Sequence, residues 1–191
     1  MADQTKILLE NLTFPEGPRW HEGRLYFSDF YAHEVVAVDM AGQRETIVEV
    51  PGQPSGLGWT PDGRLLVVSM TDRRLLRLDP GGLVEVADLS ALANYHCNDM
   101  VVDEQGGAYV GNFGFNSHDG SEFKAADLIR VDPDGSVSVA AAGLAFPNGS
   151  VITPDGGTLI VGETRGNILS AWNRAPNGTL SNRRVWADLG A

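Results

Sequence analysis

Cysteine and long apolar runs are both scarce in this sequence. Cys97 is the only cysteine among 191 residues, which excludes an internal disulfide and is typical of a reducing compartment. No apolar stretch approaches the ~20 residues that a membrane-spanning helix needs. Ile7–Leu9 is too short to be the core of a signal peptide. We therefore expect a cytoplasmic protein.

Basic residues are also few. There are 14 Lys and Arg against 25 Asp and Glu, which gives a formal net charge of -11. A surface with this balance repels nucleic acids and anionic membranes, and it tolerates cations. By itself the acidic excess indicates little more than solubility. We expect no nucleic-acid partner and no membrane partner.

The motifs of several enzyme classes are missing. No Gly-x-Gly-x-x-Gly follows a strand and opens a helix, and neither a Walker sequence nor Gly-x-Ser-x-Gly occurs. The four histidines show no metal-type spacing. Because no base is placed beside Cys97, this thiol is predicted to be packed rather than nucleophilic. Phosphate cofactors and serine-hydrolase chemistry therefore have no support.

The sequence contains a repeated motif that is rich in glycine, proline and β-branched residues. A short tripeptide is followed by an apolar strand, a turn and a second β-rich strand. The motif occurs four times, with its tripeptide at residues 15–17, 54–56, 97–99 and 147–149. Two further β-patterned segments follow each copy. An additional short strand is expected at residues 6–10.

The spacing of the repeats predicts the fold class. Their starts recur every 40–50 residues or so, and a loop at 113–126 accounts for most of the longest interval. Four strands per unit at this period is the signature of an all-β β-propeller. A β-sandwich is the alternative, but it does not explain why the tripeptide recurs at one phase. We expect a single domain over residues 1–191, with blades near 15–52, 54–95, 97–145 and 147–189.

The central residues of the tripeptides are candidates for a binding site. If each tripeptide opens an innermost strand, all four side chains lie around the mouth of the central channel. They are Glu16, Ser55, Asn98 and Asn148. All are oxygen donors, which suits a hard divalent cation. Asn and Ser are also ordinary turn residues, so both interpretations stay open.

A second set of polar residues ends the following strands. Its members are Asp29, Ser69, Asn112 and Glu163. They are expected on the same rim, where they would either orient the inner ligands or be solvated strand ends. Solvated ends are the favoured interpretation.

Three motifs also carry a family resemblance. Phe14–Pro18, Cys97–Asp103 and Phe146–Gly149, the last followed by Thr153–Gly156, resemble the SMP-30/gluconolactonase/LRE family of regucalcin-like lactonases. The resemblance covers practically the whole chain. It implies a six-bladed propeller with a divalent cation (Ca, Zn, Mg or Mn) in its channel. It also implies an enzyme that hydrolyses a small-molecule substrate, a lactone of a sugar or a related compound.

The resemblance assigns roles to individual residues. Glu16 and Asn148 match the family's glutamate and asparagine metal ligands, and Asn98 matches an asparagine that contacts substrate close to the metal. His96 stands where some members carry a substrate-binding arginine. Asn116 stands where some members use a glutamate in the entrance loop. The departure at His96 puts recognition of sugar acids in doubt.

The family's third metal ligand has no counterpart in the sequence. It is an aspartate that opens the next blade and also serves as general base, and the chain ends at Ala191, where that blade would begin. We therefore expect about four of six blades, a truncated product, no catalytic residue within the chain and impaired hydrolysis. The alternative is a non-catalytic propeller fragment that acts as a binding module. Open blade edges favour self-association in either case.

Overall fold

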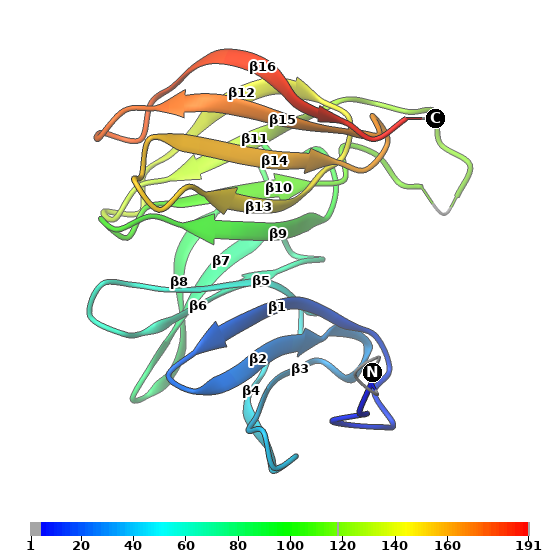
Figure 1. Cartoon of the computed structure of the whole chain (residues 1–191), viewed down its shortest axis with the longest axis vertical. Coiled ribbons are helices and arrows are strands. Elements are labelled where there is room, and N and C mark those ends of the chain that lie inside the picture. The colour runs from blue at the N-terminus through cyan, green and yellow to red at the C-terminus, as the bar shows by residue number, and fades with distance from the viewer. Residues whose placement is uncertain (1–4, 118, 191) are drawn as a thin grey trace.

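The computed structural model describes residues 5–117 and 119–190. These residues form four antiparallel sheets of four strands each, which we number as blades 1 to 4 (Figure 1). Blade 1 also contains a short 3-10 helix, η1 (Phe30–Ala32). No helix formed by the described residues has the length and apolarity to cross a bilayer.

Within each blade the strands follow one another in chain order. Blade 1 contains β1 (Pro15–His21), β2 (Arg24–Asp29), β3 (Glu34–Val38) and β4 (Arg44–Glu49). Blade 2 contains β5 (Pro54–Trp59), β6 (Leu65–Ser69), β7 (Arg74–Asp79) and β8 (Gly82–Asp88). Blade 3 contains β9 (Cys97–Val102), β10 (Ala108–Asn112), β11 (Ala126–Val131) and β12 (Val137–Leu144). Blade 4 contains β13 (Pro147–Ile152), β14 (Thr158–Glu163), β15 (Ile168–Arg174) and β16 (Leu180–Asp188).

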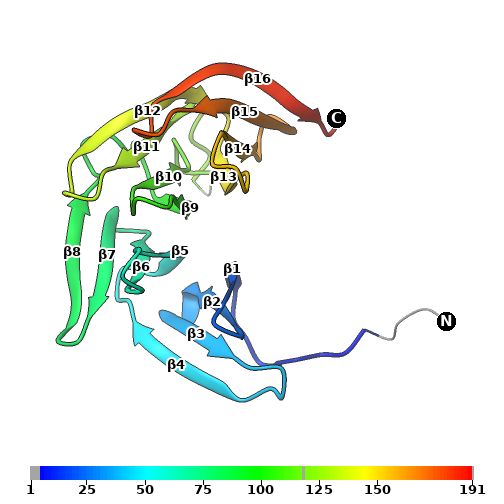
Figure 2. The ribbon, with the colours of Figure 1, turned by 60° about the vertical axis from the view of Figure 1, so that its left-hand side comes forward.

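The blades follow one another in an arc, with the first strand of each blade innermost (Figure 2). Strand β1 contacts β5, β5 contacts β9, and β9 contacts β13, so the inner strands succeed one another around a common axis. This arrangement is that of propeller blades. The predicted all-β class and the propeller arrangement are confirmed.

Turn chemistry explains why inner and second strands pair as predicted. In blade 2 the turn after β5 closes with a hydrogen bond from the Gly63 amide to the Thr60 carbonyl at 2.8 Å, and Gly63 has φ +81°. The turns that end at Gly106 and Gly156 repeat this bond and this positive φ. Glycine adopts that conformation without the steric cost that other residues meet. The repeated turns therefore set the register of three hairpins.

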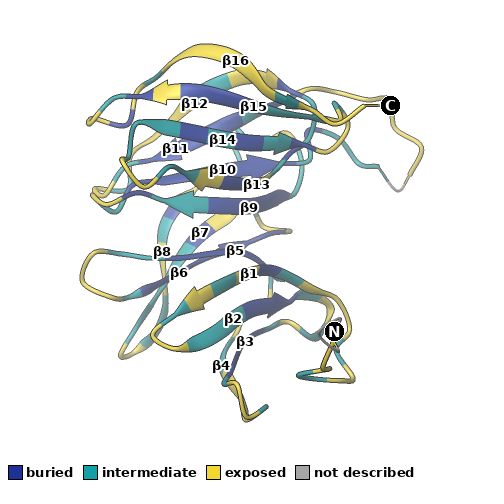
Figure 3. Ribbon diagram, in the orientation of Figure 1, coloured by how far each residue is buried: buried dark blue, intermediate teal, exposed yellow. Residues whose placement is uncertain are grey.

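The core lies between successive blades, where sheets pack face to face. Strands β5, β6 and β10 are almost completely buried, whereas β16 on the outside is mostly exposed (Figure 3). Leu66 of blade 2 and Ile129 of blade 3 belong to one apolar cluster. Tyr109 of blade 3 and Trp172 of blade 4 belong to another. This packing holds the inner strands at fixed positions around the axis.

The strand expected at residues 6–10 is wrong, because these residues form no ladder. Leu8 and Leu9 instead pack on Phe27 and Val38 of blade 1. They lie against the face of the sheet, which offers side chains but no backbone hydrogen bonds. Leu8 and Leu9 thus contribute side-chain packing and no strand pairing.

Candidate functional site

The four tripeptides open the four inner strands on one rim of the propeller. Asn98 of β9 donates through its side-chain amide to the carbonyl of Pro147, next to Asn148, at 3.4 Å. Ser55 and Asn98 are buried, whereas Glu16 and Asn148 are partly exposed. The predicted ring thus divides into two buried members and two partly exposed ones.

Asp99 occupies the centre of this arrangement, and sequence reasoning missed it. It follows Asn98 at a position where the other three tripeptides have glycine. A Cβ on Gly17 would lie 3.7 Å from one oxygen of Asp99, and a Cβ on Gly149 would lie 3.9 Å from the other. Arg19 reaches from blade 1 to bond this carboxylate at 2.6 Å. The sequence did contain a signal: when the four tripeptides are aligned, Asp99 is the one carboxylate at a position where the other three have glycine.

Burial and like charge shape the electrostatics of the mouth. Burial, together with the nearby negative charge of Asp99, raises the pKa of Glu16 above its ordinary value. Burial also raises the pKa of Asp99, against the opposing effect of Arg19. A partly buried carboxylate without a cationic partner gains stability when a cation binds beside it. Glu16 therefore has the environment of a cation ligand.

The polar residues that end the second strands are all buried, so the favoured interpretation as solvated strand ends is wrong. Asp29 accepts hydrogen bonds from the backbone amides of Thr13 and Phe14 at 3.0 and 2.7 Å. Glu163 accepts one from the amide of Ala145 at 2.7 Å. Buried carboxylates that accept such bonds hold the backbone firmly. Asp29 and Glu163 thus anchor the segments that lead into β1 and β13, which carry Glu16 and Asn148.

A pocket of about 470 Å³ opens at this mouth, and Glu16, His96 and Thr164 are among the residues that line it. His96 stacks on Tyr95, with ring centroids 4.0 Å apart. The side-chain amide nitrogen of Asn148 donates a hydrogen bond to the side-chain oxygen of Thr164 at 3.4 Å. The pocket thus brings together Glu16, His96 and the hydrogen-bond partner of Asn148.

Asn116 lies elsewhere among the described residues. It donates to Asp119 at 2.9 Å and lines a separate hollow with Tyr95 and Lys124. Its neighbour Ser117 lines the mouth pocket instead. The structure therefore places the entrance loop beside the mouth without bringing Asn116 into the pocket with Glu16.

The residues present fit a divalent cation in chemical type and fall short in number. Glu16 offers a carboxylate and Asn148 an amide oxygen, both of which suit hard cations. Calcium takes six to eight oxygen ligands and magnesium six. Within the ranges that the structure describes, no three His, Cys, Asp or Glu residues gather as a metal site. Two protein oxygens on one rim are thus the contribution that this chain makes.

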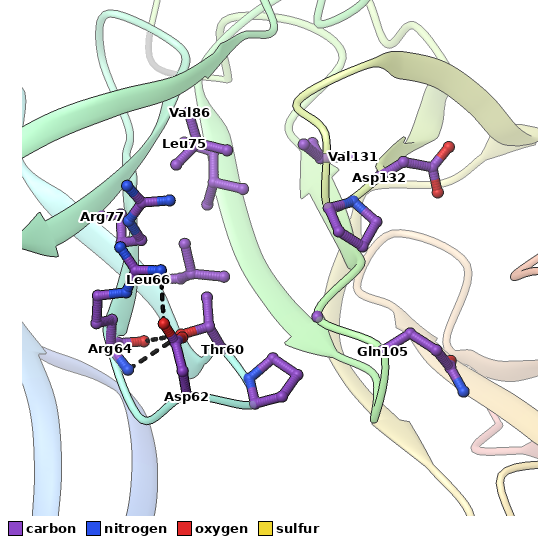
Figure 4. A pocket seen from close by; sticks show the side chains of 13 residues that line it. Thr60, Asp62, Arg64, Leu66, Leu75, Arg77, Val86, Gln105, Val131 and Asp132 are labelled. Carbon is purple, nitrogen blue, oxygen red and sulfur yellow. Dashed lines mark hydrogen bonds and ion pairs between the residues drawn. The ribbon is translucent and has the colours of Figure 1, made fainter.

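A second hollow, of about 250 Å³, opens between blades 2 and 3 at the opposite end of the inner strands (Figure 4). Both arginines that line it are already paired: Arg64 with Asp62 at 2.6 Å, and Arg77 with Asp79 at 2.7 Å. The hydrogen bond from Arg77 lowers the pKa of Asp79 to about 2. Because each guanidinium is already paired, this hollow is a weaker candidate for an anionic ligand than the mouth is for a cation.

Cys97, which opens β9, is predicted to be unreactive in the folded chain. It is fully buried, and this burial raises the pKa of its thiol to about 12. Since the thiolate is the reactive form, we expect labelling by a disulfide reagent at pH 8 to be at least about 100-fold slower in the native chain than in guanidinium chloride. Stopped-flow absorbance measures both rates. Rapid labelling of the native chain would contradict the prediction.

The fold and the mouth define the class of protein: a β-propeller with an oxygen-rich candidate cation site at one end of its channel. The chain belongs to the SMP-30/Gluconolactonase/LRE-like family, whose model matches residues 14–191. It is 26% identical over 180 residues to a gluconolactonase of Zymomonas mobilis, covering 82% of this chain. It is 29% identical over 154 residues to the pentonolactonase XacC of Haloferax volcanii, covering 79% of this chain.

The comparisons also show how much of a relative this chain represents. It spans 50% of each of these two curated relatives. A solved structure of regucalcin from Agrobacterium tumefaciens, described as a calcium-binding protein, superposes with a TM-score of 0.80 at 24% identity. That match covers 95% of this chain and 62% of the regucalcin chain. At this identity the likeness shows the fold alone.

Proposed function

We propose that this chain carries the metal- and substrate-binding part of a lactonase that hydrolyses lactones with the help of a divalent cation. The proposal is supported by the family and by the lactonases among the relatives. One observation carries it: Glu16 and Asn148 open inner strands on the same rim, and Glu16 shares one pocket with Thr164, which bonds Asn148.

In this proposal each residue has a defined task. Glu16 and Asn148 hold the cation, which when bound supplies polarisation of the lactone carbonyl and stabilisation of the negative oxygen. Asn98 is the proposed substrate contact, although its side chain is nearly buried and its side-chain nitrogen donates to the carbonyl of Pro147. His96 lies at the wall of the pocket. Asn116 acts at the entrance, outside the pocket.

The reaction itself is addition of water to the lactone carbonyl followed by opening of the ring. A water oxygen bonds to the carbonyl carbon, the ring ester bond breaks, and the leaving alkoxide takes a proton to give a hydroxy acid. We assign no general base within this chain. Asp99 is occupied by its ion pair with Arg19, and Glu16 is committed to the cation. We therefore expect weak hydrolysis by this chain alone.

Binding of the metal is expected to stabilise the fold. For a dissociation constant near 0.1 mM, about 1 mM calcium adds about 1.4 kcal/mol, which for a domain of this size raises Tm by about 3–6 °C. Glu16→Gln should abolish this rise, because the variant removes the charged ligand. Thermal unfolding followed by circular dichroism, repeated with manganese and zinc, measures the effect.

The controls separate loss of the ligand from loss of structure. Without metal, Glu16→Gln should melt at the same temperature as the parent chain or slightly higher, because a half-buried charge beside Asp99 has been removed. Glu49→Gln, at an exposed strand end, should keep the full response to metal. An equal metal shift in Glu16→Gln would contradict the metal site. Robust lactone hydrolysis by this chain, abolished by Glu16→Ala, would contradict the expected weakness.

A further inference from the structure

One position in each repeat determines the wall of the mouth pocket. The residues that directly precede the four tripeptides all line it: Phe14, Gln53, His96 and Phe146. Each blade therefore contributes one side chain through the same structural position. Three of the four are ring side chains. The residues at these four positions therefore influence the chemistry of the pocket separately from the ring of Glu16, Ser55, Asn98 and Asn148.

The wall on the blade 1 side is an aromatic cluster. Phe14 lies 4.5 Å from Phe30 and 5.7 Å from Tyr31, and Phe30 lies 4.3 Å from Tyr31, measured between ring centroids. All three rings line the pocket. Phe14 and Tyr31 are exposed, so their faces are available to a ligand. We call this cluster the first aromatic wall.

Blades 3 and 4 contribute a second aromatic wall. Phe113 stacks on Phe146 with centroids 4.5 Å apart and an interplanar angle of 27°, and it lies 6.0 Å from His96. Phe146 has φ +65°, a left-handed conformation that is costly for a bulky side chain. Hydrogen bonds from its amide to Leu144 and from the Thr164 amide to its carbonyl hold it there. The fold thus maintains a strained backbone that presents this ring at the mouth.

The rings of the two walls and Met70 make up the apolar half of the pocket lining, and several of the polar residues are already engaged. Glu16 is the proposed cation ligand, Thr164 bonds Asn148, and His96 is stacked on Tyr95. A polyhydroxylated lactone needs several converging donors and acceptors, because buried hydroxyls without partners weaken binding. A flat apolar ring instead gains contact with aromatic faces on both sides. Gln53, Ser117 and Arg165 also line the pocket and can bond the carbonyl end of such a ligand.

We propose that this pocket selects lactones with an aromatic or apolar ring over polyhydroxylated sugar lactones, with the two aromatic walls as the specificity-determining surfaces. The inference rests on the proposed lactone hydrolysis, whose substrate class it specifies. Sugars can also stack their C–H faces on aromatic rings, so the decisive comparison is between the two ligand classes. Binding has to be measured without hydrolysis.

Lactam analogues, which resist hydrolysis, make that comparison possible. Dihydroquinolinone stands for the aromatic lactone dihydrocoumarin, and gluconolactam stands for gluconolactone. With calcium present, titration by ligand-observed NMR should show dihydroquinolinone binding at least about 10-fold more tightly. Phe113→Ala should remove most of this preference, because it weakens dihydroquinolinone binding much more than gluconolactam binding. Phe123→Ala, an exposed ring that packs on Phe115 outside the pocket, should change neither affinity.

Two further variants guard against a folding artefact. Phe113→Leu keeps apolar volume and removes the ring, and Phe14→Ala tests the opposite wall; each should weaken dihydroquinolinone binding selectively while circular dichroism stays unchanged. Equal or tighter binding of gluconolactam, or equal losses in Phe113→Leu and Phe123→Ala, would overturn the inference. If the preference holds but neither parent lactone is hydrolysed and Glu16→Gln keeps its metal response, the proposed function fails while the binding preference stands.

Discussion

Replacing Asp103 by alanine is expected to destabilise the fold by about 3–5 kcal/mol, because two buried arginines lose the buried carboxylate that they share and keep only the more exposed Asp132 and Glu104 as ion-pair partners. The Asp103 side chain is 0% exposed and pairs with Arg130 at 2.6 Å and with Arg174 at 3.0 Å. Both arginine side chains are buried as well, at 7% and 1% exposure. The other carboxylate oxygen accepts backbone amides from Gln105 and Gly107 at 3.0 and 2.8 Å. One residue thus closes the hairpin of blade 3 and binds blades 3 and 4 together.

Urea unfolding measures this loss, and Asp134→Ala is the matched control. Asp134 lies in the equivalent kind of turn but is exposed and bonds only Ser136, so its loss should cost less than about 1 kcal/mol. If the two variants differ by less than that amount, the buried network does not stabilise the fold as argued.

The acid dependence of stability provides a second readout for Asp103. Burial works against its charged form, but hydrogen bonds from Arg130, Gly107 and Arg174 outweigh this, and its pKa is lowered from 3.8. A lowered folded pKa gives stability that is fully present above 3.8 and is lost as the pH falls through the folded value. The parent chain should therefore lose stability below about pH 4 more steeply than Asp103→Ala does. Parallel acid profiles would contradict this origin.

The blades could be predicted from sequence because their signals are local. Period-2 apolar patterns and Gly-containing turns specify hairpins within a few residues of chain. The recurrence of the tripeptide then placed all four inner strand starts correctly, from Pro15 to Pro147. The pattern at residues 6–10 failed because a strand also needs a neighbouring edge, and apolar alternation carries no information about that edge.

The site was less accessible, because its decisive contacts are distant in sequence. Arg19 and Asp99 meet across 80 residues, and only the packing of blade 1 against blades 2 and 3 brings them together. Ser55 and Asn98 are buried on inner strands that have another inner strand on each side, and a repeat alignment does not report these neighbours. Asp29 and Glu163 were expected at strand ends but not as buried anchors, since their partners lie in the preceding connections.

Gly56→Ala is expected to cost about 3 kcal/mol or more, at the upper end of what overpacking a core position costs. A Cβ at Gly56 would lie 2.8 Å from the backbone carbon of Asp99 and still closer to the backbone nitrogen of Met100. These are main-chain atoms of β9, so relief requires β5 to move away from β9. Gly56 has no positive φ, and the cost is therefore steric rather than conformational.

Gly81→Ala is the matched control, because a Cβ there meets no atom within 4 Å and its φ is also not positive. It should change the free energy of unfolding by no more than about 0.5 kcal/mol. Moving β9 also moves Asp99 relative to Gly17 and Gly149, so Gly56→Ala should weaken the calcium-induced rise in Tm as well as lower Tm itself. If Gly56→Ala matches Gly81→Ala in urea unfolding, the inner strands are not held at the spacing that brings Glu16 and Asn148 to one mouth.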